Sequence, residues 1–513
     1  MALRKLFSSY HMQPVPKSTL ISAYRQLLAD GEISENKQLE SLLTKRAVRT
    51  LSGVSVITVL TKPFICPGKC VYCPTEPNMP KSYLSNEPAA QRAVRNKFDA
   101  IDQLQSRIRA LDNNGHEVDK LEIIVLGGTW SAYDKAYQEE FVRDLFYAAN
   151  AYGTGDSSLG ARPSSEQRVP STLLEEQTIN ETSRYRIIGL TLETRPDHID
   201  EDEVKRLRWL GCTRVQLGVQ HTDDKLLELI RRGDTLANAI KATRLLKEAG
   251  FKVDHHYMPD LPGSTPAHDL EMFRYVYTSE DLQPDQVKIY PCVVNEYAQL
   301  WHWYKNGKYT PYSEKELYDL LMDIKRITPP YVRINRLIRD IPEESIIAGN
   351  SITNLRQYLQ KQLADQGEFC KCIRCREARA DVSGATTAIL KSRTYRASQG
   401  QEYFLSYESD DEKTIYAFCR LRFNDAPEAS FIPELQHAAL VRELHVYGQM
   451  IPVDHQGGEV QHIGFGRKLM AEAERLSIEA GYKKIAVISG IGVREYYRKL
   501  GYVLEGTYMT KSL

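Results

Sequence analysis

Cys66-Pro-Gly-Lys-Cys70-Val-Tyr-Cys73 places three thiols on one short loop, at C-x3-C-x2-C spacing. The loop follows an apolar run over residues 54–60, which predicts a strand that ends before Pro63. Three thiolates can hold three irons of a [4Fe-4S] cluster. Because no fourth cysteine is near, one iron stays free to bind the amino and carboxylate groups of S-adenosylmethionine (SAM), whose reductive cleavage releases a 5′-deoxyadenosyl radical.

A structural zinc loop is the alternative for these cysteines, but zinc takes four ligands and the surrounding loop offers no histidine. The iron–sulfur cluster is therefore the favoured interpretation. With the aromatic Tyr72 just before the last cysteine, the spacing resembles the signature of radical SAM enzymes. That resemblance implies that Cys66, Cys70 and Cys73 bind the cluster and that Tyr72 lies beside the adenine of SAM.

Short apolar runs alternate with helical stretches from Thr50 to about Tyr290, and this pattern predicts a parallel (βα) barrel or part of one. The runs cover residues 54–60, 121–126, 186–192, 213–217 and 287–290. Barrel enzymes place ligand contacts where their strands end, so polar residues at those points are candidates for cofactor binding.

Three strand ends offer candidates of this kind. Gly127 and Gly128 follow the second run, where missing side chains let the backbone approach the amino-acid part of SAM, although a plain turn is the commoner cause of such a pair. Glu193 is expected to hold the ribose or the ammonium group, and Arg195 to pair with a carboxylate.

Two adjacent histidines, His255 and His256, end another predicted strand. A histidine in this position is a core or rim residue as readily as a ligand-binding one. The sequence leaves both interpretations open.

The C-terminal part contains a glycine turn, Gln461-His-Ile-Gly464-Phe-Gly466, at the start of a predicted helix over residues 464–480. Backbone amides at the positive end of a helix bind pyrophosphate. A predicted strand over residues 440–447 precedes the turn, and a strand over residues 484–488 and the stretch Glu495-Tyr-Tyr-Arg-Lys-Leu-Gly-Tyr502 follow it. The turn alone would also suit a dinucleotide fold. In this order the elements resemble the GNAT acetyltransferase fold.

The GNAT resemblance implies how acetyl-CoA is bound. The amides around Phe465, Gly466 and Arg467 would take the pyrophosphate, and Tyr497 matches the tyrosine that acts as an acid at the thioester. The strand segment expected to pair with the pantetheine arm consists of Glu443, Leu444, His445 and Val446. Neighbours on a helix point in different directions, so at least one of the adjacent tyrosines, Tyr496 and Tyr497, is expected to pack into the core.

The cysteine loop, the run Gly189-Leu-Thr-Leu-Glu-Thr-Arg-Pro-Asp197 and the acetyl-CoA pattern together resemble the catalytic subunit of Elongator, in its stand-alone prokaryotic form. The resemblance implies synthesis of 5-carboxymethyluridine at the wobble uridine (U34) of tRNA. Acetyl-CoA would supply a two-carbon unit, the 5′-deoxyadenosyl radical would take hydrogen from its methyl group, and the carbon radical would add to C5 of uridine. Lys120 matches the family's lysine that contacts acetyl-CoA, and it joins Tyr497 as an expected catalytic residue.

A second cluster, Cys370-Lys-Cys372-Ile-Arg-Cys375, gives three thiols within six residues, which suits tetrahedral zinc if another segment supplies the fourth ligand. Cys292 is the expected fourth ligand, and His302 is the second choice. A second iron–sulfur cluster and unliganded thiols are the alternatives. Zinc is favoured because a basic segment between two domains would gain from a structural staple.

Binding of tRNA is inferred from clustered basic residues that would contact phosphates without reading sequence. The candidates are Lys45, Arg46, Arg49, Arg92, Arg95, Lys97, Arg333 and Arg336. The chain has 67 basic and 67 acidic residues, so such a surface has to come from uneven placement. Most charge runs are simply solvated, and the family resemblance carries most of the weight here.

The predicted fold class is α/β, in several domains, because 513 residues exceed what one core supports. The expected parts are an N-terminal basic helical extension (1–49), a radical SAM partial barrel (50–325), a zinc-stapled basic linker (326–395) and a GNAT domain (396–513). Residues 153–170, rich in Gly, Ser, Pro and charge, are expected to form an exposed loop.

The sequence contains no run of about 18 apolar residues, so we expect no membrane span and a cytoplasmic location. Nine cysteines, six of them in two clusters, are too few for a disulfide scaffold. The cluster would require an external electron donor, and the choice between a monomer and a homodimer stays open.

Two other functions compete with the main interpretation. The GNAT-like part could acetylate protein lysines, with the iron–sulfur loop as an accessory. A non-catalytic RNA-binding scaffold with vestigial motifs is the weakest alternative, because both cofactor motifs keep the residues that their chemistry needs.

Overall fold

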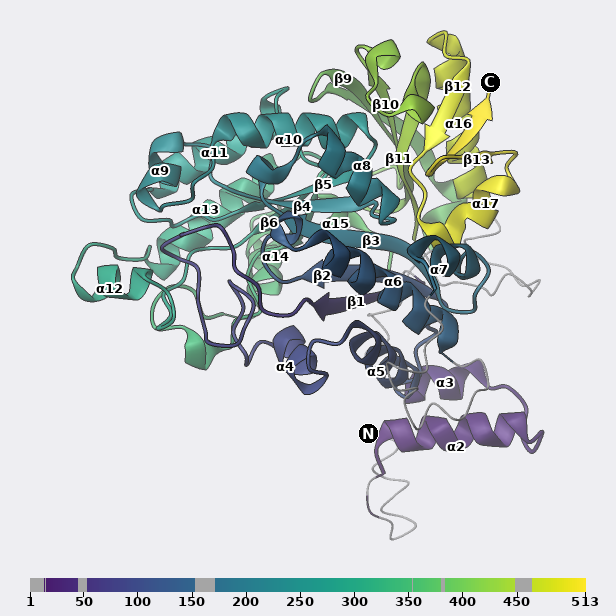
Figure 1. The fold of residues 1–513 in the computed structure, drawn as a ribbon, viewed down its shortest axis with the longest axis horizontal. Helices are drawn as coiled ribbons and strands as arrows, with labels where there is room; N and C mark the ends of the chain where they lie inside the picture. The colour runs from purple at the N-terminus through teal and green to yellow at the C-terminus, as the bar shows by residue number, and fades with distance from the viewer. Residues whose placement is uncertain are drawn as a thin grey trace.

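The computed structural model describes residues 13, 15–44, 53–152, 171–352, 354–379, 383–447 and 464–513. Within these ranges the chain forms two seven-stranded sheets with helices around them (Figure 1). Several predictions fall outside the described residues and stay untested by the structure. They concern Lys45, Arg46, Arg49, the loop 153–170 and the residues 461–463 of the glycine turn.

The first sheet is entirely parallel, and its strands follow one another in chain order, which confirms the predicted part-barrel. Its strands are β1 (Ser55–Leu60), β2 (Lys120–Leu126), β3 (Arg186–Thr194), β4 (Arg214–Gln220), β5 (Lys252–Tyr257), β6 (Gln286–Ile289) and β7 (Arg333–Arg336). The edge strands β1 and β7 are not paired with each other, so the sheet is a half-barrel. All the carboxyl ends of the strands lie at one edge, so the segments that follow each strand meet there.

Helices connect these strands and cover the outer face of the sheet (Figure 1). The connecting helices are α4 (Pro88–Arg95), α5 (Ala100–Asp112), α6 (Lys135–Ala151), α7 (Leu173–Asn180), α8 (Glu201–Trp209), α9 (Asp224–Leu229), α10 (Leu236–Glu248), α11 (Pro266–Thr278), α12 (Leu300–Lys305) and α13 (Glu314–Ile327). Side-chain caps fix the first residues of several helices. Thr172 before α7 and Ser313 before α13, for example, each form a capping box with the glutamate three residues later.

The second sheet is mixed, in the order β13-β14-β12-β11-β10-β9-β8. Its strands are β8 (Ile389–Arg396), β9 (Gly400–Glu408), β10 (Ile415–Asn424), β11 (Ala438–Val446), β12 (Lys484–Val487), β13 (Val503–Glu505) and β14 (Tyr508–Ser512). Only β11 and β12 pair in parallel, and α16 (Phe465–Glu479) joins them in the direction of the chain. The predicted α/β class is therefore confirmed for both parts of the molecule.

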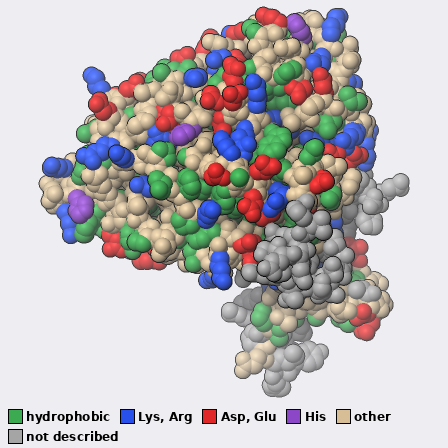
Figure 2. All heavy atoms as spheres, in the orientation of Figure 1, with side chains coloured by type: hydrophobic (Ala, Val, Ile, Leu, Met, Phe, Trp, Pro, Cys, Tyr) green, Lys and Arg blue, Asp and Glu red, His purple; other side chains and the backbone are tan. Residues whose placement is uncertain are grey.

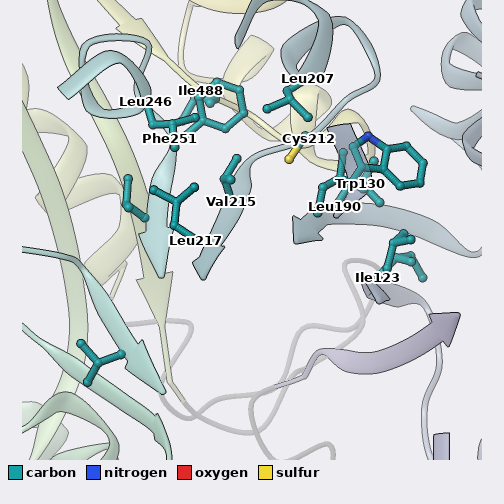
Figure 3. Close-up of a cluster of buried hydrophobic side chains, with 14 of the residues drawn as sticks. Ile123, Trp130, Leu190, Leu207, Cys212, Val215, Leu217, Leu246, Phe251 and Ile488 are labelled. Carbon is teal, nitrogen blue, oxygen red and sulfur yellow. The ribbon is translucent and has the colours of Figure 1, made fainter. Parts of the chain in front are cut away.

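The two sheets meet through a shared hydrophobic cluster, beside which the second sheet has a core of its own. Ile488, next to the end of β12, belongs to the same buried cluster as Leu246 and Phe251 of the half-barrel (Figure 3). Gly490 packs so closely against β3 that an added Cβ would lie 2.0 Å from the carbonyl oxygen of Ile188. The two parts are therefore fused by packing.

Buried ion pairs cross the same contact, which we call the seam. Asp285, just before β6, pairs with Arg442 of β11 and lies 3.6 Å from Arg420 of β10. Glu402 of β9 lies 3.7 Å from Lys247 of α10 across the seam, and within the second sheet it pairs with Arg442 (3.2 Å) and Arg422 (3.0 Å). Each carboxylate in the seam thus meets at least two cations.

The segment expected to be a linker, residues 326–395, contributes to both sheets. It supplies β7 to the half-barrel and most of β8 to the second sheet, with α14 (Leu355–Asp365) and α15 (Ile373–Arg376) between them. The first sheet therefore extends past the boundary expected at residue 325. The reason is that strand β7 pairs with β6 through three residue pairs, Gln286 with Arg333 being the first.

The described N-terminal residues form two helices, α2 (Lys17–Ala29) and α3 (Lys37–Leu43), which lie beside α5 at one end of the molecule (Figure 1). Arg25 pairs with Asp112 at 2.8 Å. The face seen in Figure 2 carries acidic and basic side chains interspersed. None of the described helices is both long and apolar enough to cross a membrane.

Candidate functional site

The main cavity among the described residues, about 850 Å³, lies inside the half-barrel and reaches from the first cysteine loop to Arg374 near the start of β7. This volume falls in the range of about 300–1,000 Å³ typical of small-molecule sites. Cationic side chains outnumber acids along its wall. The cations are Lys81, Arg92, Arg107, Arg195, Arg214, Arg232, Lys288, Arg333, Arg336, Arg339 and Arg374, and the acids are Glu87, Glu122, Glu193 and Asp340.

The three cysteines of the first loop line this cavity. The loop is tied down by its backbone, since Val71 N donates to Ile230 O (3.0 Å) and Leu300 N donates to Val71 O (2.8 Å). The Sγ of Cys66 lies 3.5 Å from Oγ1 of Thr129, which follows β2. The structure therefore holds the loop where the carboxyl ends of the first strands meet.

A buried cation accompanies these thiols. Arg232 is 5% exposed, and its Nη1 lies 3.7 Å from Sγ of Cys70. The hydrogen bond from Cys73 and, against the opposing effect of burial, the Arg232 guanidinium together lower the pKa of the Cys70 thiol to about 5. Thiolates are the form of cysteine that binds iron, so the residues present fit a [4Fe-4S] cluster held by three ligands.

Two expected SAM contacts lie at the same end. Tyr72 lines the cavity and is 8% exposed. Gly127 has φ 147°, and a Cβ there would lie 1.8 Å from Oγ1 of Thr61, so only glycine fits. Gly128, with φ 103°, borders the cavity directly. The backbone without a side chain that faces the cavity is therefore that of Gly128, whereas Gly127 makes room for the Thr61 side chain.

Glu193 also lines the cavity, where it accepts a hydrogen bond from the Tyr83 hydroxyl (3.0 Å). Arg195, by contrast, is already engaged. Its guanidinium binds both carboxylate oxygens of Asp197 (2.8 and 2.7 Å) and the carbonyls of Arg232 and Gly233. Its contacts hold the loop that carries Arg232, so we assign it to positioning that loop.

The structure separates the two neighbouring histidines. His255 is fully buried between Thr243 (3.0 Å) and the Tyr257 hydroxyl (2.9 Å), so it is a core residue. His256 faces the opposite way and lines the cavity. Its Nδ1 lies 3.7 Å from a carboxylate oxygen of Glu193.

The second cysteine cluster is much tighter. The thiols of Cys370, Cys372 and Cys375 lie within 4.8 Å of one another, and in the described part of the chain no other group of metal-binding side chains is as close. Four ligands at a Zn–S distance of about 2.3 Å stand roughly 3.8 Å apart in a tetrahedron. Lys325 approaches Cys375 at 3.5 Å, which favours the thiolate form. These three residues therefore fit a single small metal ion.

The fourth ligand expected from Cys292 is not brought to this cluster. Cys292 follows β6 and belongs to the hydrophobic cluster that contains Cys70 and Tyr72. The second cysteine cluster instead adjoins the start of β7, where Ile373 N donates to Val332 O (3.0 Å). The two places lie at opposite ends of the parallel strands, and the second choice, His302, lies on α12 beyond the same end as Cys292.

The residues expected to bind acetyl-CoA lie on the second sheet. Strand β11 pairs with β12 only up to Val441, so the backbone from Glu443 to Val446 is not paired with β12. The side chains of this segment alternate: Glu443 faces Arg420 (3.0 Å), whereas Leu444 packs on the core of the second sheet. Burial lowers the pKa of His445 to about 4, so this imidazole is neutral.

The helix α16 begins at Gly464, which has φ 69°, and its first residues are Phe465, Gly466 and Arg467. Tyr497 is 6% exposed and belongs to the hydrophobic core of the second sheet. Tyr496 is 37% exposed, and its hydroxyl would lie 2.7 Å from a Cβ added at Gly466. The tyrosine beside the start of α16 is therefore Tyr496, and Tyr497 is the one that packs inward.

Lys120 lies at the start of β2, paired in register with Arg186. An added Cβ at Gly492 of the second part would meet the Cβ of Arg186 at 2.5 Å, so this edge adjoins the second sheet. Burial lowers the pKa of Lys120. The full length of β2, roughly 20 Å, separates Lys120 from the end that carries the first cysteine loop.

The described candidates for RNA binding fall into two groups. Arg95 and Lys97 are exposed on or after α4, and Arg92 and Arg336 line the cavity. Arg333 is committed instead to Glu377 (2.8 Å) and the Tyr447 hydroxyl (2.9 Å) within the molecule. Those contacts argue against a phosphate contact for Arg333.

Sequence reasoning missed several residues of the cavity wall. Lys288 and Asn335 come from β6 and β7, and Arg232 comes from the segment after β4. A signal was available for Lys288, because a charge inside a short apolar strand needs a buried partner. No sequence signal marks Arg232, whose place depends on the loop that Arg195 holds.

Comparison with known families confirms the radical SAM interpretation of the half-barrel. Residues 62–276 match the radical SAM superfamily, and residues 284–365 match the radical SAM C-terminal domain. The chain is 42% identical over 504 residues to a protein of Methanocaldococcus jannaschii named tRNA uridine(34) acetyltransferase, a match that covers 95% of this chain and 90% of the relative.

A eukaryotic relative and a solved structure are also similar to this chain. Elongator complex protein 3 of Danio rerio is 37% identical over 490 residues, covering 92% of this chain and 86% of that protein. The structure of archaeal Methanocaldococcus infernus Elp3 with an N-terminal deletion superposes with a TM-score of 0.76 at 38% identity, covering 90% of this chain and all of that one. These matches extend across both sheets.

Proposed function

We propose, from the premise that this chain belongs to the family of tRNA uridine(34) acetyltransferases and Elongator complex protein 3, that it modifies the wobble uridine of tRNA. The observation that carries the proposal is the extent of the match, 95% of this chain at 42% identity to a relative with that name. The product that we propose is 5-carboxymethyluridine, made from acetyl-CoA and SAM.

The cavity end with the first cysteine loop is the proposed radical site. Cys66, Cys70 and Cys73 would hold the cluster, and Arg232 would offset its negative charge. With SAM, the bound cluster would supply a 5′-deoxyadenosyl radical able to take hydrogen from the methyl group of an acetyl thioester. Gly127 and Gly128 leave room for the amino-acid part of SAM.

The second sheet is the proposed acetyl-CoA site, in a GNAT-type domain. The segment of β11 that has no partner in β12 leaves backbone donors and acceptors for the amides of a pantetheine arm. The start of α16, at Phe465, Gly466 and Arg467, offers backbone amides to a pyrophosphate. Lys120, at the adjoining edge of the half-barrel, would complete this site.

The proposed acid at the thioester is one of two adjacent tyrosines, and their burial makes the choice testable. Tyr496→Phe should slow acetyl-CoA turnover by tenfold or more, because its hydroxyl lies next to Gly466. Tyr497→Phe should change turnover by less than about threefold if Tyr497 only packs in the core. The opposite ranking would restore Tyr497 as the acid, as the family resemblance implies.

The second cysteine cluster is proposed to hold a structural zinc ion that fastens residues 326–395 between a radical SAM part (50–325) and a GNAT part (396–513). Its three thiols come within 4.8 Å of one another, which suits one small ion. Metal analysis of the purified protein should find about one zinc per chain in addition to iron. An iron-only result would favour a second iron–sulfur cluster.

The decisive experiment incubates the reconstituted protein with tRNA, acetyl-CoA and SAM, followed by nucleoside mass spectrometry. We expect 5-carboxymethyluridine at position 34 and no product without SAM. Unmodified uridine, with cluster and zinc both shown to be present, would refute the proposal. Acetylation of protein lysines that survives Cys70→Ser and does not depend on tRNA would favour the lysine acetyltransferase instead.

A further inference from the structure

Among the buried polar atoms of the half-barrel that have no hydrogen-bond partner in the described residues, two lie on β5. They are Nε2 of His256 and Oδ1 of Asp254, from alternate positions of β5. Alternate residues of a strand share one face, and His256, only 5% exposed, lines the cavity. An unpaired buried polar atom is costly, so one that faces a cavity indicates a ligand that completes the hydrogen bond.

The neighbours of His256 define the chemistry of this place. Lys288 is its register partner on β6, and the ammonium donates to Oε1 of Gln216 (2.6 Å). An ammonium has three donors, so further donors are left for a ligand. The ring of Tyr290 lies 5.7 Å from the imidazole and 6.0 Å from the Lys288 ammonium. We call Gln216, His256, Lys288 and Tyr290 the lumen pocket.

The protonation of His256 follows from its surroundings. Burial lowers the pKa of this imidazole well below its usual value, and the nearby Lys288 lowers it further, so the ring is neutral. The Glu193 carboxylate, 3.7 Å from Nδ1, favours the tautomer with hydrogen on that nitrogen. Nε2 is then an acceptor. The lumen pocket therefore presents an acceptor, a cationic donor and an aromatic face.

A uracil ring matches this arrangement. Its N3–H is a donor flanked by two carbonyl oxygens, and its flat face stacks on aromatic rings. We propose that the lumen pocket binds the uracil base of the substrate nucleotide, with His256 accepting from N3–H, Lys288 donating to an adjacent carbonyl and Tyr290 stacking on the ring. This inference rests on the proposed function and assigns the residues that select the base.

The same geometry disfavours cytosine. Cytosine has an acceptor at N3 and an amino group in place of one carbonyl, so it would set acceptor against acceptor at His256 and donor against donor at Lys288. Like groups facing each other in a buried site leave both without a partner. Selection of uridine would thus come mainly from rejection of the wrong base.

The surroundings of the pocket suit a nucleotide that has left the base stack. Arg336, the last residue of β7, and Arg339, in the segment after it, line the same cavity. Arg336 is exposed, whereas the Arg339 guanidinium lies 4.9 Å from the Tyr83 ring centroid. Because Arg339 is already paired with Glu87 (3.1 Å), a phosphate would meet the exposed Arg336 while the base turns inward, as in other enzymes that act on a flipped base. The cavity of about 850 Å³ leaves room for SAM beside it.

The first arm of the test changes only the RNA, so protein folding cannot affect it. Anaerobic holoprotein with SAM is titrated with fluorescent anticodon stem-loops that differ at the wobble base alone: uridine, cytidine or 3-methyluridine. The uridine RNA should bind about tenfold more tightly than either of the others. Equal affinities for the three RNAs would overturn the proposal.

The second arm changes the pocket. His256→Phe keeps an aromatic ring against Tyr290, and Lys288→Met keeps a long side chain but removes its charge. Each should reduce the preference for uridine over cytidine to within about twofold. Arg336→Gln, at the mouth, should weaken all RNAs equally and keep the ratio, and Lys305→Met, on α12 away from the cavity, should change neither. Melting temperatures confirm that each variant is folded.

Two results would count against the pocket alone. If folded His256→Phe and Lys288→Met proteins keep the full preference for uridine, the base binds elsewhere. If these variants keep that preference but lose SAM affinity in equilibrium dialysis, the pocket belongs to SAM. Either result leaves the proposed function intact when the wild-type protein still modifies tRNA. Absence of modification despite a clear uridine preference would instead refute the function and leave the pocket standing.

Discussion

The end of the half-barrel near the first cysteine loop and the seam between the two sheets both bury many charged groups, but they treat them differently. In the seam, Asp285 and Glu402 each face at least two cations. At the cysteine end, Nε2 of His256 and Nε of Arg232 have no hydrogen-bond partner, and both residues line the cavity. In the described residues, the seam thus pairs both carboxylates within the molecule and leaves only Nη1 of Arg420 without a hydrogen bond, whereas the cysteine end keeps unpaired atoms on the wall of a cavity that a ligand can enter.

The two cysteine clusters show the same contrast. Cys370, Cys372 and Cys375 converge within 4.8 Å, as ligands of one ion do. Cys66, Cys70 and Cys73 line a cavity of about 850 Å³ and, within the described residues, do not form so tight a group. The space around the cysteines therefore underlies our proposal that one group of three serves structure and the other serves chemistry.

The largest expected effect comes from Cys70→Ser. Loss of one of three proposed cluster ligands should lower the iron content and reduce tRNA modification by a thousandfold or more. The reason is that the proposed radical forms only when SAM is cleaved at the cluster. The unfolding transition should move by less than about 1 kcal/mol if this end is built for ligands. Iron analysis, product assays and urea denaturation measure the three quantities.

Cys212→Ala, a buried thiol in the core of the half-barrel, is the matched control, and it should keep full iron content. A Cys70→Ser protein that unfolds as readily as a seam variant would contradict the contrast between the two regions.

Breaking the seam should cost stability. Asp285→Ala leaves Arg442 and Arg420 buried without their shared carboxylate, and removal of one partner from a buried ion pair costs about 3–5 kcal/mol. Asp281→Ala, an exposed neighbour in the same loop, should cost less than about 1 kcal/mol. Urea denaturation gives both values, and equal effects for the two variants would show that the seam charges are dispensable.

A backbone change at the cysteine end tests how closely that end is shaped. Gly127→Ala forces a Cβ to within 1.8 Å of Thr61 at a φ of 147°, which should cost about 2 kcal/mol and weaken SAM binding. Gly307→Ala is a suitable control, since it too has positive φ but nothing lies within 4 Å. Similar losses of SAM affinity in both variants would mean that the bare backbone at Gly127 has no part in binding.

The smallest expected effect is a pH dependence. Asp260, near the cysteine end, faces Asp269 and two tyrosines, and burial raises its pKa to about 8. In the unfolded chain the pKa of this carboxyl is about 3.9, so between about pH 4 and 8 the folded protein keeps a proton on Asp260 that the unfolded chain has lost. The contribution of Asp260 to stability is therefore lost as the pH rises from about 4 through 8. Asp260→Asn, whose amide cannot ionise, should remove this part of the pH dependence.

Asp285 in the seam should behave oppositely. Burial acts to raise the pKa of Asp285, but the nearby cations, Arg442 most of all, lower it below its unfolded value. The stabilisation from this group is therefore present above the unfolded pKa and is lost as the pH falls. Urea titrations of wild type, Asp260→Asn and Asp285→Asn at several pH values check both signs. A steeper loss of stability at high pH in the Asp260→Asn protein would reverse the first assignment.

Much of the fold could be predicted because its signals are local. Alternation of apolar runs with helices predicted the parallel sheet, and the runs at residues 54–60 and 121–126 differ from β1 and β2 by one residue each. Strand β7 was missed as part of that sheet, since Arg333 and Arg336 make it look polar. It is recognisable only through its pairing with β6.

The cysteine spacing, by itself, determined which residues could hold metal, because ligands on one loop need no distant partner. The tertiary structure decided the rest. It separated His255 from His256, placed Tyr496 rather than Tyr497 beside Gly466, and left Cys292 apart from Cys370, Cys372 and Cys375. Each of these outcomes depends on which strands and helices lie side by side. Contacts between side chains that are far apart in the sequence follow from that packing alone.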